Sequence, residues 1–117
     1  MRNDRENPIV DKSFLFAVEI VNYCELLHKN QKYVISNQLL KSGTSIGANV
    51  REAQNAESKQ DFIHKMKIAA KEADETIYWV SLCKAISSYP ESNNLLEKAD
   101  ELLKILSKII SSAKSNS

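Results

Sequence analysis

The sequence predicts an all-α protein that folds as an antiparallel four-helix bundle with up-down-up-down topology. Only two glycines and two prolines occur among its 117 residues, too few turn-forming residues for a fold of many short strands. Apolar residues recur every three or four positions through four long segments, as in helices with one buried face. Short connections between such helices favour antiparallel neighbours in one domain of ordinary size. The predicted helices cover about residues 10–29, 33–56, 59–87 and 92–113.

The first predicted helix follows a polar arm that ends at Pro8, and it carries two apolar stripes. Both stripes have helical spacing, so this helix is expected to have a wide apolar face. The first stripe is expected to form the seam that faces the core, and it comprises Val10, Phe14, Ala17, Val21 and Cys24. The second comprises Phe16, Ile20, Tyr23 and Leu27.

The second and third predicted helices have longer seams. The third helix is expected to begin at Ser58, which together with Asp61 resembles a capping box in which the serine hydroxyl accepts a backbone N–H. Residues 76–86 are apolar almost all round, which is typical of a helix with neighbours on more than one face. The second seam is Ile35, Leu39, Ser42, Ile46, Asn49 and Ala53, and the third is Phe62, Met66, Ala69, Ala73, Thr76, Val80 and Cys83.

The fourth predicted helix follows the clearest turn of the chain, "SSYPESNN", in which Pro90 breaks the preceding helix. Glu91 or Ser92 is expected to lie near the start of the new helix. The tail "SSAKSNS" is expected to fray. The seam of this helix is Leu95, Ala99, Leu102, Leu106, Ile109 and Ala113.

Both glycines of the chain fall within "LLKSGTSIGANVREA", residues 39–53. Their GxxxG spacing lacks the GxxxxGK and Ser or Thr of a phosphate-binding loop, and it also lacks the GxGxxG of a dinucleotide-binding turn. No predicted strand precedes Gly43, because the helical seam continues through it. We therefore expect Gly43 and Gly47 to lie in mid-helix and to thin one face for close packing, as small residues do between helices.

Polar residues of the second helix are expected to extend this thin face and to meet the third helix. Buried polar groups need partners, and the third helix offers three candidates, Lys65, Glu72 and Glu75. The predicted arrangement is a hydrogen-bond network that sets the register of the two helices, and a ligand site is the alternative. The predicted network comprises Ser42, Ser45, Asn49, Glu52, Glu72 and Glu75.

Composition narrows the range of functions. Sixteen Lys and Arg residues face fifteen Asp and Glu residues, for a formal net charge of +1, so no overall attraction to nucleic acid or membrane is expected. No apolar run approaches the ~20 residues of a membrane span, and the polar start "MRNDRENPIV" lacks a signal peptide. Cys24 and Cys83 lack metal-binding or redox spacing, which favours buried free thiols over a disulfide. These observations predict a cytoplasmic protein without membrane partners.

A metal-dependent bundle enzyme is the alternative with the least support. Glu25 and His28, and likewise Asp61 and His64, form acid-x-x-His pairs of the kind that di-iron bundles use. In the predicted topology His28 lies near the end of the first helix and His64 near the start of the parallel third helix. At ~1.5 Å of rise per residue they are roughly 20 Å or more apart. No metal, cofactor or catalytic residue is therefore predicted, and no serine lies in a GxSxG motif.

Two segments carry a resemblance to a known family. "QLLKSGTSIGANVREA" (residues 38–53) followed by "DFIHKMKIAAKEADETIYWVSL" (residues 61–82) resembles the bacterial four-helix-bundle family, also called the 23S rRNA intervening-sequence proteins. The first and fourth helices are similar by pattern. The matching positions are Ser42, Ser45, Ile46, Asn49, Glu52, Asp61, Phe62, Lys65, Ala69, Glu72, Glu75, Thr76 and Trp79.

The resemblance implies a small cytosolic protein without catalytic activity. Some members of the family are encoded inside insertions in large-subunit rRNA genes. Their folds are antiparallel four-helix bundles that assemble as closed rings of five copies. A related protein is an accessory factor of the reverse transcriptase of diversity-generating retroelements and binds nucleic acid. The resemblance therefore implies a homo-oligomeric ring as the assembly, with RNA or DNA, a reverse transcriptase or another nucleoprotein as partners.

The first hypothesis for function is a non-catalytic accessory factor of nucleic acid or nucleoprotein. A ring multiplies any basic patch on its copies, and phosphate contacts add up. Acidic residues are interleaved with the basic ones, so an ordinary solvated charged face is the competing interpretation. The candidate nucleic-acid-binding residues are Lys41, Arg51, Lys65, Lys67 and Lys71.

The second hypothesis is a structural protein-interaction module with no role in nucleic-acid binding. It depends on the broad apolar end of the third helix, where aromatic residues suit an oligomer interface. Packing in the core of the bundle explains the same residues equally well. The candidate interface residues are Tyr78, Trp79, Leu82 and Ile86.

Overall fold

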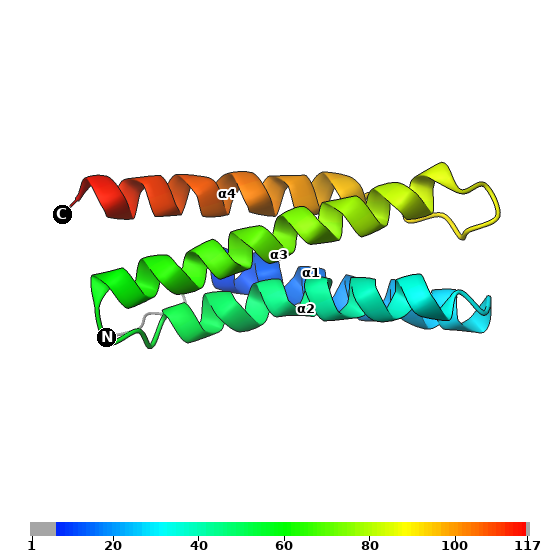
Figure 1. Cartoon of the computed structure of the whole chain (residues 1–117), viewed down its shortest axis with the longest axis horizontal. Helices are drawn as coiled ribbons and strands as arrows, with labels where there is room; N and C mark the ends of the chain where they lie inside the picture. The colour runs from blue at the N-terminus through cyan, green and yellow to red at the C-terminus, as the bar shows by residue number, and fades with distance from the viewer. Residues whose placement is uncertain (1–6, 117) are drawn as a thin grey trace.

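The computed structural model describes residues 7–116, which form four long helices (Figure 1). The helices are α1 (Pro8–Lys29), α2 (Tyr33–Ala53), α3 (Lys59–Ala85) and α4 (Leu95–Ser115), and no strand occurs among the described residues. Helix α1 packs against α2 and α4, and α3 packs against the same two helices. The predicted all-α four-helix bundle is confirmed.

The connections alternate between the two ends of the bundle (Figure 1). The α1–α2 turn and the α3–α4 loop lie together at one end, whereas the α2–α3 link lies at the other with the start of α1 and the end of α4. The α3–α4 loop is tied to α1, because the Tyr23 hydroxyl donates a 2.7 Å hydrogen bond to the Pro90 carbonyl. Sequential helices are therefore antiparallel neighbours, with up-down-up-down topology.

Local chemistry explains where the helices begin and end. Pro8 lies in the first turn of α1, where its missing N–H costs nothing. Helix α2 ends three residues earlier than predicted, because the chain after Ala53 continues through tighter i to i+3 hydrogen bonds. Helix α4 begins only at Leu95, since Asn93 adopts a positive φ of 52° that interrupts helical geometry. Its last turn reaches Ser115, further than the fraying tail that the sequence predicts.

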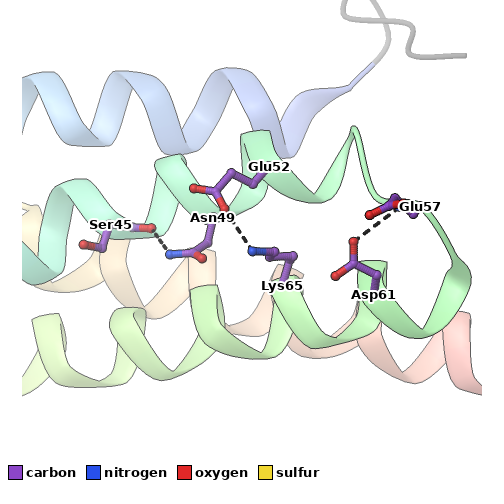
Figure 2. Close-up of polar contacts among 6 residues, drawn as sticks. All are labelled: Ser45, Asn49, Glu52, Glu57, Asp61 and Lys65. Carbon is purple, nitrogen blue, oxygen red and sulfur yellow. Dashed lines mark hydrogen bonds and ion pairs between the residues drawn. The ribbon is translucent and has the colours of Figure 1, made fainter.

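The predicted cap of α3 is present. The Ser58 hydroxyl accepts a hydrogen bond from the Asp61 backbone N–H at 3.0 Å. The Asp61 carboxylate in turn accepts from the backbone N–H of Glu57 at 3.3 Å (Figure 2). This reciprocal pair satisfies amide groups at the start of the helix and fixes the direction in which α3 leaves the α2–α3 link.

The predicted core seam of α1 was wrong. Phe16 is 2% exposed and Ile20 is fully buried, whereas Phe14 is 66% and Val21 37% exposed. The second stripe thus faces the bundle, and much of the first stays at the surface. Both stripes have the same period, and only the directions of α2 and α4 decide which one is buried. The seams of α2, α3 and α4 supply most of the remaining core.

Both cysteines are buried free thiols, as the sequence predicts. The Cys24 thiol donates to the Ser36 carbonyl at 3.4 Å, and the Ser36 hydroxyl donates to the Cys24 carbonyl at 3.0 Å. This exchange joins α1 to α2 near their connecting turn. Burial raises the pKa of the Cys24 thiol from 9.0 to about 11, although its hydrogen bond with Ser36 opposes the shift. Burial likewise raises the pKa of Cys83.

The stability of the fold is expected to decline in alkaline solution. A buried thiol with a raised pKa stabilises the folded state fully below its unfolded pKa of 9.0, and this contribution is lost as the pH rises toward 11. At pH 10 the Cys24 shift alone lowers the free energy of unfolding by about 1 kcal/mol. Urea unfolding between pH 8 and 10.5 measures this slope. The Cys24→Val variant is expected to show a shallower decline, and an unchanged slope would contradict the assignment.

Candidate functional site on α2 and α3

The two glycines lie in the middle of α2 at its contact with α1. Neither has a positive φ, so both adopt conformations open to any residue. A Cβ atom built on Gly43 would lie 2.8 Å from two side-chain carbons of Ile20, and one on Gly47 would lie 3.2 Å from the Ser13 carbonyl oxygen. The glycines therefore admit α1 at close range, in agreement with the predicted packing role.

The prediction that the polar residues of α2 extend the thin face made by these glycines was wrong. Gly43 and Gly47 face α1, whereas Glu52 reaches Lys65 on α3 (Figure 2). A helix turns about 100° per residue, so Asn49, two residues after Gly47, lies about 160° around the helix from it. Asn49 is therefore on the side of α2 that points away from α1. Helix α2 thus has two specialised flanks, a thin one against α1 and a polar one toward α3.

The polar flank is held mostly by bonds within α2. The Ser45 hydroxyl donates to the Lys41 carbonyl at 2.6 Å. The Asn49 side-chain amide donates to the Ser45 carbonyl at 2.9 Å, as Figure 2 shows. The bond that crosses to α3 at this end is the Lys65–Glu52 ion pair at 3.1 Å. Glu52 is exposed, so this pair contributes little to stability but orients the two side chains.

A second link between these helices lies in the core. The hydroxyls of Ser42 and Thr76 are both buried and hydrogen-bonded to each other at 2.9 Å. Each hydroxyl also lies near a backbone carbonyl of its own helix: the Thr76 hydroxyl oxygen is 2.7 Å from the Glu72 carbonyl oxygen, and that of Ser42 is 3.4 Å from the Leu39 carbonyl oxygen. Two hydroxyls that satisfy each other in a dry core allow one register of α2 against α3.

The six residues of the predicted network are thus divided among separate contacts. Ser42 lies in the core, Ser45 and Asn49 bond within α2, and Glu52 meets Lys65. Glu72 contributes its backbone carbonyl, and the side chain of the exposed Glu75 makes no hydrogen bond to another side chain or backbone group among the described residues. Thr76 completes the inter-helix link. Its seam position and its match to the family pattern were the signals that pointed to it.

The five candidate basic residues do not gather in one place. Arg51 lines a groove between α1 and α2, and Lys65 pairs with Glu52 between α2 and α3. Lys67 lies beside Lys114 near the end of α4, where its hydrogen bond and its positive charge lower the pKa of Lys114. Lys67 and Lys71, one turn apart, are both exposed. Lys114, brought in from far along the chain, joins them at the α3–α4 face, a contact that only tertiary structure reveals. Lys41 is exposed on α2.

The candidate interface residues differ in exposure. Tyr78 is 58% exposed and Ile86 37% exposed, whereas Leu82 and Trp79 are half-buried. The Tyr78 and Trp79 rings meet edge to face at 5.1 Å. The indole N–H of Trp79 is buried with no hydrogen-bond partner among the described residues. Trp79 therefore belongs partly to the bundle, and Tyr78 and Ile86 form the outward part of this patch.

The histidines lie at opposite ends of the bundle. His28 lies near the α1–α2 turn, where its ring contacts Tyr33 edge to face at 5.1 Å and its Nε2 lies 3.3 Å from the Asn37 side-chain oxygen. His64 is exposed in the first turns of α3, next to the α2–α3 link. Within residues 7–116, no three His, Cys, Asp or Glu side chains come together as ligands for a metal ion.

A long apolar groove between α1 and α2 is the main surface that sequence reasoning missed. Two consecutive cavities of about 650 and 670 Å³ lie along it. Charged side chains occur toward its ends, with Asp11 and Arg51 at one and Glu25 and Lys29 at the other. The signal was present in the double stripe of α1. The α1–α2 groove, as we call it, is lined chiefly by Val10, Phe14, Ala17, Val21, Tyr33, Leu40, Thr44, Gly47 and Ala48.

Comparisons with known proteins extend these observations. The sequence model of a family described as "23S rRNA-intervening sequence protein" matches residues 5–108. A crystal structure of a protein of unknown function from the S23 ribosomal protein family of Bacteroides thetaiotaomicron VPI-5482 is similar, with 46% identity and a TM-score of 0.82. The match covers 87% of this chain and 97% of that one. The comparison with curated proteins found no match. Among the described residues, no helix has the length and apolar character needed to traverse a bilayer.

Proposed function

The chain belongs to the 23S rRNA-intervening sequence protein family, and we propose that it is a non-catalytic, homo-oligomeric accessory protein of a cytoplasmic nucleoprotein. The observation that carries the proposal is the α1–α2 groove, an apolar surface left uncovered on a bundle whose core is already complete. Large exposed apolar patches on small proteins mark sites of interaction with other macromolecules. A scaffold that associates through such a surface is the function that this geometry supports best.

The arrangement of reactive side chains supports a non-catalytic role. The Ser42 hydroxyl is buried in the core and bonded to Thr76, so it cannot approach a substrate in solvent. The two acid-x-x-His pairs are separated by most of the length of the bundle. Burial keeps the Cys24 and Cys83 thiols protonated near neutral pH, which suppresses their nucleophilicity. Ser42, Cys24 and Cys83 thus each have a structural explanation.

For the assembly we propose a closed ring of five copies, as the family resemblance implies. Exposed apolar surface is supplied by Tyr78 of α3, by Ile86 just after the end of that helix, and by the α1–α2 groove. A ring needs two different surfaces on each copy, because each contact joins one face to another.

For the partner we propose RNA or DNA, free or held by a protein such as a reverse transcriptase. Lys67, Lys71 and Lys114 place positive charge on the α3–α4 face. A chain with a net charge of +1 has little attraction for phosphate as a monomer. Five copies would present this face five times, and contacts to a phosphate backbone add up.

The partner proposal is tested by retention of labelled single-stranded and double-stranded RNA and DNA by the purified protein between 50 and 300 mM salt. Binding is expected to be salt-sensitive and to weaken severalfold in Lys67→Gln/Lys71→Gln. Lys84→Gln, which removes a charge at the other end of α3, is the matched control. Absence of binding at 50 mM salt by an assembled protein would contradict the nucleic-acid role and leave the structural interaction module as the function.

A further inference from the structure

We infer that the ring of Tyr78 is a stacking platform for an unpaired nucleic-acid base, and that Lys67 and Lys71 hold the phosphates beside it. The inference rests on the proposed nucleic-acid role, and it names the partner as a single strand rather than a duplex. Tyr78 is 58% exposed, more than any other tyrosine of the chain. Packing in the bundle core therefore does not explain an aromatic residue at this position.

Tyr78 shares one side of α3 with the two lysines. At about 100° per residue, Lys67, Lys71 and Tyr78 fall within an arc of roughly 40°, on the side of the helix opposite the buried Thr76. At ~1.5 Å of rise per residue, Lys71 lies ~6 Å along the helix from Lys67 and ~10 Å from Tyr78. All three side chains are exposed, so one nucleic-acid strand that follows α3 meets each of them.

The Tyr78 ring is steadied by its neighbour in the sequence. The rings of Tyr78 and Trp79 meet edge to face, with their centroids 5.1 Å apart and their planes at 71°. Trp79 is half-buried and packs against the core, so it limits the movement of the Tyr78 ring. Within residues 7–116, the lysine that lies over an aromatic ring is Lys32, and it covers Tyr89. The exposed Tyr78 ring is thus ordered before a base arrives, which lowers the entropic cost of stacking.

The lysines on this side are placed to hold phosphate. The ion pairs of the described part of the chain involve other lysines, so no carboxylate neutralises Lys67 or Lys71. Lys67 also lies within hydrogen-bonding reach of Lys114 on α4, and two ammonium groups at that distance repel each other. A phosphate oxygen bound between them would relieve the repulsion through charge-assisted hydrogen bonds.

The balance of charge around Tyr78 favours a single strand over a duplex. Asp74 and Glu75 lie within one turn of Tyr78, and they set two negative charges against the three lysines. The small positive excess gives little attraction for a duplex, which meets the side of a helix bundle mainly through its phosphates. A single strand also offers its bases. Stacking on an aromatic ring strengthens binding by roughly 5- to 150-fold per base, and it tolerates any base sequence.

This inference leaves the contact between copies to other surfaces. A Tyr78 ring that stacks on a base is not also buried between two copies of the chain. The exposed apolar surface that remains for the proposed ring is that of Ile86 and the α1–α2 groove. Replacing Tyr78 is therefore expected to weaken nucleic-acid binding and to leave the mass of the assembly unchanged.

The stacking site is tested by fluorescence anisotropy with labelled 20-nucleotide RNA and DNA, each as an unstructured single strand and as a duplex. The wild type is expected to bind the single strands about tenfold more tightly than the duplexes. Tyr78→Leu keeps an apolar side chain but removes the ring, and it is expected to weaken single-strand binding at least about fivefold without changing duplex binding. Tyr78→Phe keeps the ring and is expected to retain wild-type affinity.

The dependence of binding on salt separates the ring from the lysines. Tyr78→Leu removes no charge, so the slope of log K against log salt concentration is expected to stay that of the wild type. Lys67→Gln/Lys71→Gln is expected to reduce the magnitude of the single-strand slope by roughly 1.4, because each phosphate contact contributes about 0.7. An unchanged slope in this double variant would overturn the placement of the phosphates.

Controls separate this inference from the proposed function. Circular dichroism and light scattering check that each variant is folded and keeps the wild-type mass. A Tyr78→Leu protein that is folded but loses that mass would place the ring between copies and overturn the stacking site. Equal binding of strand and duplex, or wild-type affinity in Tyr78→Leu, would overturn the stacking site alone. A wild type that binds neither strand nor duplex would overturn the proposed nucleic-acid partner as well.

Discussion

Replacing Gly43 by alanine is expected to lower the free energy of unfolding by about 2 kcal/mol, although alanine is the better helix former. The added Cβ would lie 2.8 Å from both γ-carbons of Ile20, closer than carbon atoms approach in folded proteins. Ile20 is fully buried and branched at that position, so it cannot turn its side chain aside. Helix α1 must instead move away from α2, which loosens the core on both sides. Urea unfolding at matched protein concentrations measures the loss.

Gly43→Ala is expected to raise the free energy of unfolding, rather than lower it, when Ile20 is replaced by a smaller residue. In an Ile20→Ala background the methyl group introduced by Gly43→Ala fills vacated space, and the intrinsic helical preference for alanine, about 1 kcal/mol, becomes a net gain. Gly47→Ala is the matched control in the wild-type background. Its Cβ would lie 3.2 Å from the Ser13 carbonyl, a milder contact that this preference roughly offsets. Equal losses for Gly43→Ala and Gly47→Ala would contradict a role for the Ile20 contact.

Replacing Thr76 by valine is expected to destabilise the bundle by about 2 kcal/mol while preserving its shape. Valine keeps the volume of threonine but removes the hydroxyl that bonds Ser42 at 2.9 Å. Ser42, which is 1% exposed, is then left with the long 3.4 Å contact to the Leu39 carbonyl. A buried hydroxyl without a good partner retains the cost of its lost hydration.

A double-mutant cycle separates this pairing from the other contacts of Thr76. Ser42→Ala/Thr76→Val is expected to cost less than Thr76→Val alone, because the second change removes the orphaned hydroxyl. Ser45→Ala is the control, since it deletes a hydroxyl that bonds only the Lys41 carbonyl of its own helix and is expected to change stability by less than about 0.5 kcal/mol. Additive losses in the cycle would show that the two hydroxyls act independently.

Much of the fold could be predicted because one physical signal dominates each element. Apolar periodicity places α2, α3 and α4 on the correct core faces, and Ser58 with Asp61 marks the start of α3. Helix ends were less predictable. The positive φ of Asn93 delays the start of α4, and its tight-turn geometry has no clear counterpart in the pattern around Pro90.

The surfaces of the bundle were harder to predict, because they depend on which helices become neighbours. Two stripes of equal period on α1 leave open whether Phe14 or Phe16 points inward. Likewise, Gly47 and Glu52 are close in sequence but contact different neighbours, Ser13 of α1 and Lys65 of α3, and that division appears only when α1 and α3 are both in place. The meeting of Lys67 with Lys114 has the same origin, since it joins positions 47 residues apart.

The alternation of the connections between the two ends of the bundle determines where an attached fluorophore or fused domain would lie. Helix α1 begins and α4 ends at the same end of the bundle, while the α1–α2 turn and the α3–α4 loop occupy the other (Figure 1). In a ring whose helices run parallel to its axis, the starts of α1 and the ends of α4 of all copies would converge on a single rim. A fluorophore or fused domain attached there would decorate one side of the assembly and leave the opposite rim bare. Labels on the two sides would then report which rim a bound partner approaches.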